Sequence, residues 1–68
     1  MIETDKYQKK KRIIVETLRK NENQLQLLEL KIKSKLPNLY FFKALETLEN
    51  ENVILRFKKH NETWIKIV

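Results

Sequence analysis

The chain has 68 residues, of which 15 are Lys or Arg and 9 are Asp or Glu, so its formal net charge is +6 at pH 7; it has neither Cys nor Gly. Without Cys, the sequence excludes a disulfide framework, a thiolate zinc site and a cysteine nucleophile. Without Gly, it excludes the glycine-rich phosphate loops of nucleotide-binding enzymes. Since 41% of its residues are hydrophobic, this length predicts a single small folded domain over 1–68.

The positive charge favours a polyanionic partner, although a lysine-rich composition can also reflect an AT-rich genome. No apolar run approaches the roughly 18 residues that a membrane span needs, and residues 1–12 are too polar for a signal peptide. The sequence therefore predicts an intracellular protein, cytoplasmic or, in a eukaryote, nuclear, with no membrane partner.

The first predicted helix is capped by Thr4 or Asp5 and runs to about Lys20. The polar residues 21–23 then indicate a turn. One face of this helix is apolar except for a lysine, whose stem must lie along the core while its ammonium reaches water. The residues expected on that face are Tyr7, Lys11, Ile14, Val15 and Leu18.

A second helix is predicted over about Gln24–Lys35, with two apolar stripes instead of the single stripe of an ordinary surface helix. Pro37 ends it and suits the first turn of a third helix over about Asn38–Glu51. Asn52 tolerates the left-handed geometry of a helix stop. The stripes are Leu27 with Leu30, and Leu25, Leu28 and Ile32; the inner face of the third helix is Phe41, Ala44, Leu45 and Leu48.

Two β-strands are predicted after the helices, over 53–58 and 63–68, because β-branched and aromatic residues dominate there. A hairpin that turns on His60 and Asn61 pairs Phe57 with Trp64 and Val53 with Val68. These pairs give the hairpin one apolar face.

This order of elements, in one small basic chain, resembles the winged helix-turn-helix family of DNA-binding domains. The resemblance covers nearly all of 13–68 and implies a mostly α, α+β fold: three helices followed by a C-terminal β-hairpin wing. It depends on apolar residues at the family's core spacing and on the strand that follows Asn52. Those residues are Leu25, Leu27, Leu30, Leu36, Phe41, Leu45, Leu48, Val53 and Ile54.

The resemblance implies that the third helix enters a groove of double-stranded DNA, while the start of the second helix and the wing touch phosphates. The chain would then be a transcriptional regulator or an architectural factor, not an enzyme, and Ile13 could pack against a second copy in a homodimer. The implied DNA-binding residues are Gln26, Asn38, Tyr40, Lys43, Thr47, Arg56, Lys58, Lys59, His60 and Asn61.

An alternative is a winged-helix module that binds protein, as an accessory subunit of a replication, transcription or other assembly. The segment 38–51 has one lysine against three glutamates, a net charge of −2, which suits DNA poorly. Its apolar residues are either core, if the helix register is shifted by one, or a protein-binding surface. The predicted protein interface is Leu28, Ile32, Leu39, Tyr40 and Phe42.

Catalytic and metal sites have weak support in the sequence. His60 is the only histidine and lacks candidate co-ligands nearby. Ser34, Asp5 and His60 are scattered residues with no indication of the mutual geometry of a triad. The sequence therefore predicts no catalytic residue, metal, cofactor or small-molecule substrate.

Overall fold

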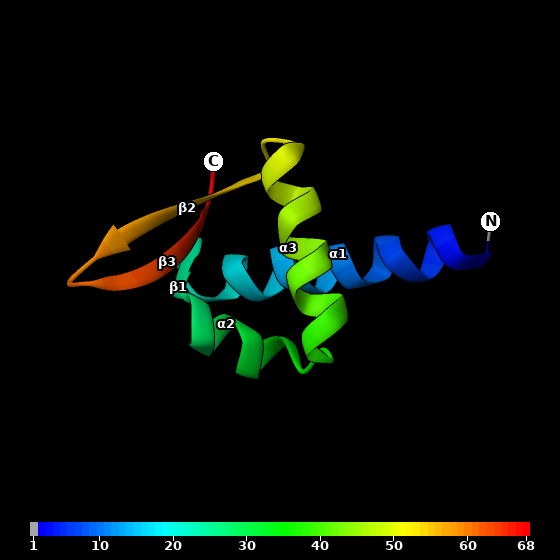
Figure 1. Cartoon of the computed structure of the whole chain (residues 1–68), viewed down its shortest axis with the longest axis horizontal. Helices are drawn as coiled ribbons and strands as arrows, with labels where there is room; N and C mark the ends of the chain where they lie inside the picture. The colour runs from blue at the N-terminus through cyan, green and yellow to red at the C-terminus, as the bar shows by residue number, and fades with distance from the viewer. Residues whose placement is uncertain (1) are drawn as a thin grey trace.

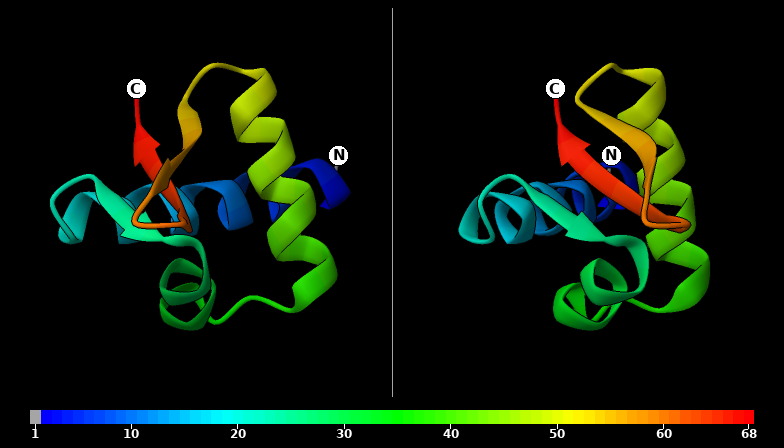
Figure 2. Two further views of the ribbon diagram at one scale, coloured as in Figure 1. Left: turned by 60° about the vertical axis from the view of Figure 1, so that its left-hand side comes forward. Right: turned by 90° about the vertical axis from the view of Figure 1, so that its left-hand side faces the viewer.

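The computed structural model describes the backbone of residues 2–68 and the side chains from Gln8 onward. Helix α1 runs along the length of the molecule, α3 crosses it, α2 lies below, and a hairpin projects from one side (Figures 1 and 2). This confirms the predicted α+β fold of three helices and a C-terminal hairpin. In chain order the elements are α1 (Ile2–Lys20), β1 (Gln24–Gln26), α2 (Leu27–Ser34), α3 (Asn38–Asn50), β2 (Ile54–Lys59) and β3 (Glu62–Ile67).

The strands form an antiparallel sheet in the order β1-β3-β2. Phe57 pairs with Trp64, as predicted from the turn position. The connection consists of His60 and Asn61 alone, with φ of 53° and 63°. Two successive positive φ angles are typical of a type I′ turn, whose twist matches that of the flanking strands. This tight turn makes the wing a short hairpin without a flexible loop.

The core lies where α1, α3 and the inner face of the sheet meet. Ile14 of α1, Leu45 of α3 and Ile65 of β3 are fully buried. The predicted inner face of α3 is confirmed in full. The remaining buried apolar residues are Leu18, Leu25, Leu30, Phe41, Ala44, Leu48 and Ile54.

Strand β1 was not predicted, because residues 24–26 were expected to open the second helix. Leu25 instead pairs with Ile65 at the edge of the sheet, and the amide of Ile67 donates to the carbonyl of Asn23 at 2.9 Å. This pairing joins residues about 40 positions apart in the sequence, so no local pattern reveals it. The second helix is consequently short and begins at Leu27.

The predicted start of the first helix was also wrong. α1 already includes Ile2, so Thr4 and Asp5 lie within it rather than at its cap. No Pro or Gly interrupts residues 2–5, and the helix continues through them. The predicted core position Tyr7 lies outside the described side chains.

Within residues 2–68, six non-glycine residues adopt the left-handed conformation that glycine usually supplies. Lys35 ends α2 with φ 58° and ψ 27°, so a lysine occupies the left-handed position at which helices commonly end on glycine. Asn52 follows α3 with φ 60°, as predicted for a helix stop. The other four are Glu22, Asn23, His60 and Asn61.

Lys11 lies on the buried side of α1 with 8% of its surface exposed. Its Nζ donates to both carboxylate oxygens of Glu51 at 3.0 Å. The stem therefore lies along the core as predicted, but the ammonium meets a carboxylate beyond the end of α3. This ion pair fixes the C-terminal end of α3 against α1.

Within the part of the chain that the structure describes, no helix combines the length and the apolar character needed to cross a membrane.

The left-handed turns give a first prediction. We expect Lys35→Gly to raise the free energy of unfolding by about 1 kcal/mol, because glycine removes the steric cost of positive φ. Asn52→Gly should gain less, since asparagine tolerates this conformation. Urea unfolding of both variants measures the difference, and a destabilised Lys35→Gly variant would contradict it.

Candidate nucleic-acid interface

The wing presents its basic residues in two directions. Side chains alternate along β2, so Arg56 and Lys58 lie on the side of the sheet that faces the helices, whereas Lys59 lies on the outer side. Lys58, Lys59 and the two turn residues are exposed. The tip therefore carries positive charge on both faces of a hairpin that projects beyond the helices (Figure 1).

Arg56 connects the wing to α3. Its Nη2 donates to Oε1 of Glu49 at 2.6 Å, and both side chains are partly exposed. The contact holds the base of the wing beside α3, so that the two elements form one surface. It also offsets the charge of Arg56. Lys58, which lies nearer the tip, therefore provides the positive charge on this side of the wing.

Helix α3 presents few basic groups outward. Asn38, Tyr40 and Lys43 are exposed as predicted. Thr47 is half-buried and its hydroxyl donates to the carbonyl of Lys43 at 3.1 Å. Because Glu46 shares the exposed face, the charge on this helix does not favour phosphate.

The outer face of the sheet holds an aromatic pair beneath two lysines. The ring centroids of Phe57 and Trp64 are 6.5 Å apart. The Lys59 ammonium lies 4.7 Å from the Trp64 ring centroid, and the Lys66 ammonium lies 5.5 Å from that of Phe57. The predicted cross-strand pair is thus confirmed, but it lies on the side away from the core, because Ile54 and Ile65 occupy the inner side.

Two lysines near this aromatic pair were absent from the predicted site. Lys66 is two residues after Trp64 in β3, and strand alternation places both on one face. Lys20 and Lys59 line a hollow of about 410 Å³ together with Trp64. The alternation was a usable signal for Lys66, whereas only the tertiary structure brings Lys20 to this place.

Gln26 is held on the same outer face. It is opposite Trp64 in the sheet, and its Nε2 donates to the Glu62 carboxylate at 2.6 Å. Apart from the four predicted DNA-binding residues on α3, the predicted DNA-binding residues therefore lie in three places. Gln26 and Lys59 lie on the outer face, Arg56 and Lys58 on the side of α3, and His60 and Asn61 at the tip.

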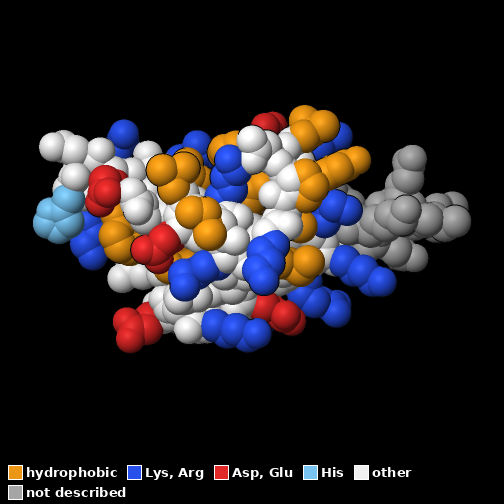
Figure 3. Space-filling model, turned by 90° about the horizontal axis from the view of Figure 1, so that it is seen from below, with side chains coloured by type: hydrophobic (Ala, Val, Ile, Leu, Met, Phe, Trp, Pro, Cys, Tyr) orange, Lys and Arg blue, Asp and Glu red, His pale blue; other side chains and the backbone are white. Residues whose placement is uncertain are grey.

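The predicted protein-binding residues are exposed, which confirms the predicted register of α3. The exposed fractions are 74% for Leu39, 73% for Ile32, 59% for Leu28 and 44% for Phe42. Figure 3 shows this side of the molecule, with hydrophobic side chains exposed among lysines and arginines.

Tyr40 is exposed too, but it lies on a different flank of α3. The Lys10 ammonium of α1 is 4.7 Å from its ring centroid, whereas Lys31 of α2 lies 5.9 Å from the ring of Phe42. Positions 40 and 42 are about 200° apart around a helix. The predicted interface therefore separates into four residues that line hollows on α2 and α3, and Tyr40, which lies beside α1.

No catalytic or metal-binding arrangement is visible among the described residues. His60 lies at the wing tip, while the Ser34 hydroxyl donates to the carbonyl of Lys31 at 3.0 Å. Asp5 lies outside the described side chains. In residues 8–68, no group of three His, Asp or Glu side chains is placed to hold a metal ion.

A solved structure shows the same arrangement of elements: the crystal structure of the Zalpha domain from Carassius auratus PKZ in complex with Z-DNA. The superposition has a TM-score of 0.73 at 18% sequence identity, and it covers 91% of this chain and 97% of that one. This chain has the winged-helix fold. No protein-family model and no curated protein matches the sequence.

The contact between wing and α3 gives a second prediction. A double-mutant cycle of Arg56→Ala and Glu49→Ala should give a coupling free energy of about 0.5 kcal/mol, the usual size for a partly exposed ion pair. The coupling should shrink at high salt because the pair is screened. A coupling of zero in low-salt thermal unfolding would show that Arg56 does not hold the wing to α3.

Proposed function

We propose that this chain binds double-stranded DNA by gripping phosphates with its wing. The observation that carries the proposal is the exposure of Lys58 and Lys59 on opposite faces of a hairpin whose two-residue turn fixes its shape. Two such lysines reach phosphates without needing a particular base sequence, and phosphate contacts provide most non-specific affinity.

The outward face of α3 supports binding that is not sequence-specific. Leu39 and Phe42 have no groups that match the hydrogen-bonding edges of bases, and Glu46 repels phosphate. Asn38 and Lys43 are the exposed residues of this helix that supply polar contacts at the DNA surface. An architectural factor fits this chemistry better than a regulator that reads a defined operator.

The fold comparison supports nucleic acid as the class of partner. The Zalpha domain that shares this fold was crystallised with Z-DNA. Its nucleic acid is a left-handed duplex, and phosphate contacts are available on either form of DNA. We therefore expect the wing of this chain to bind both B-form and Z-form duplexes with similar affinity.

Fluorescence anisotropy with a mixed-sequence duplex, measured over a salt series, tests the proposal. The affinity of the unmodified chain should fall steeply with salt. In a Lys58→Ala, Lys59→Ala variant, the slope of log affinity against log salt should flatten by about 1.8, which corresponds to about 0.9 for each lost phosphate contact.

Lys33→Ala is the matched control, since Lys33 is an exposed lysine on α2 and not on the wing. It should leave the slope nearly unchanged. A dissociation constant weaker than about 100 μM near physiological salt, beyond the usual non-specific range, would contradict the proposal, and so would an equal loss in the control. Repeating the titration with alternating dC-dG DNA in its left-handed form shows whether the shape of the duplex matters.

A further inference from the structure

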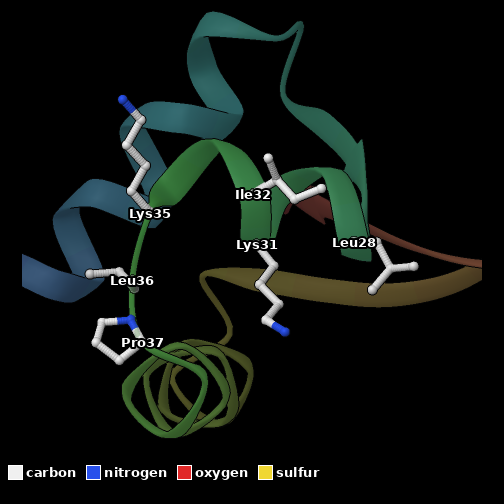
Figure 4. A pocket seen from close by; sticks show the side chains of 6 residues that line it. All are labelled: Leu28, Lys31, Ile32, Lys35, Leu36 and Pro37. Atoms are coloured by element: carbon white, nitrogen blue, oxygen red, sulfur yellow. The ribbon is translucent and has the colours of Figure 1, made fainter.

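A second surface, distinct from the wing, surrounds the link between α2 and α3. Leu28 and Ile32 project from α2 four residues apart, and Leu36 and Pro37 follow in the link (Figure 4). These side chains line a hollow of about 600 Å³. Leu39 and Phe42 line a second hollow of about 520 Å³ at the start of α3. We call the two hollows together the α2–α3 groove.

Most apolar residues of this groove lie outside the core, although Leu36 packs against it. Leu30, Phe41 and Leu45 already fill the space between these helices and the core, and each is fully buried. Single exposed apolar residues are ordinary on protein surfaces, but a contiguous group around a concave surface marks a binding site. The groove thus has the composition of the centre of an interface, where a few apolar anchors provide most of the affinity.

The rim of the groove is positively charged. Lys31 and Lys35 line the first hollow, and Lys43 lines the second with Glu46 as the one carboxylate among the lining residues. In Figure 4, Lys31 extends toward α3 and Lys35 extends in another direction, so the charges lie on different sides of the apolar residues. A partner with complementary charge therefore carries acidic groups beside an apolar stripe.

We propose that the α2–α3 groove binds an acidic amphipathic helix of a protein partner. Such a helix places apolar side chains at every third or fourth position into the groove, as in other helix-in-groove complexes. Its carboxylates then face the lysines of the rim. The interaction is independent of the phosphate-binding role proposed for the wing.

Other occupants fit the groove less well. In a two-fold dimer the same patch meets itself, which would place one lysine rim against the other. A flat lipid surface suits side chains that protrude from a protein. It suits less well the side chains of this groove, which line two hollows. Duplex DNA has no apolar group that fills the space between Leu28 and Ile32, so its phosphates would meet only the rim.

The test uses a labelled peptide of about 18 residues, or five helical turns, with Leu and Phe on one face and Glu and Asp elsewhere. A scrambled peptide of equal composition is its control. Ile32→Ser should weaken binding about tenfold, as expected for an interface anchor, whereas Ile13→Ser, which removes an exposed isoleucine from α1, should not. Lys31→Glu should weaken binding more than Lys33→Glu, because Lys33 does not line the groove.

Circular dichroism melting verifies that each variant folds. We expect both serine variants to fold, because both isoleucines are exposed. The proposal fails if the scrambled peptide binds equally well, or if Ile13→Ser weakens binding as much as Ile32→Ser. Binding to phosphatidylcholine–phosphatidylserine vesicles that depends on Ile32, without peptide binding, would assign the groove to a membrane and overturn the proposal. Self-association that Ile32→Ser abolishes, again without peptide binding, would assign it to a second copy.

Discussion

The packing of α1 and α3 against the inner face of the sheet is the contact on which the rest of the structure depends. Ile14, Leu45 and Ile65 meet there without exposure to solvent. Each such side chain contributes about 1.5–3 kcal/mol through burial, a large share of the roughly 5–15 kcal/mol by which a domain is stable. Because β3 carries Ile65 and pairs with both other strands, this contact also anchors the base of the wing and the start of α2.

The core leaves two surfaces free, and they have different chemistry. Beyond Ile54 and Ile65 the hairpin has no buried residue, and its distal end carries lysines around a two-residue turn. Around the α2–α3 link, by contrast, apolar side chains remain outside the core with lysines beside them. The first surface suits a phosphate backbone, and the second suits a protein helix with acidic groups. If both proposals hold, one small chain brings DNA and a protein partner together.

Local sequence signals predicted the three helices, apart from the starts of the first two, and the register of the hairpin. The 3.6-residue period identified the inner face of α3, and His60 with Asn61 fixed the pairing of Phe57 with Trp64. The strand β1 was missed because Leu25 is held by Ile65, a partner distant in the sequence. The orientation of the hairpin was also not predicted, since both of its faces contain apolar residues and only the packed helices decide which is buried.

Most of the predicted site residues are exposed, but how they group into surfaces was not predicted. Leu28, Ile32, Leu39 and Phe42 are exposed and line the two hollows of the α2–α3 groove, but Tyr40 lies on another flank beside Lys10. On the wing, Arg56 is paired with Glu49, an interaction between elements that composition does not reveal. Sequence patterns identify which residues are exposed, while the ion pairs and the grouping into surfaces depend on how the elements pack.

The most direct test of this account is amide chemical-shift mapping of the isotope-labelled chain during titration with mixed-sequence duplex DNA. The account predicts that the largest changes occur over 58–61, at the end of the wing, with smaller changes at the start of α3. Changes confined to 28–37, around the α2–α3 link, would contradict it, because DNA would then occupy the surface assigned to protein.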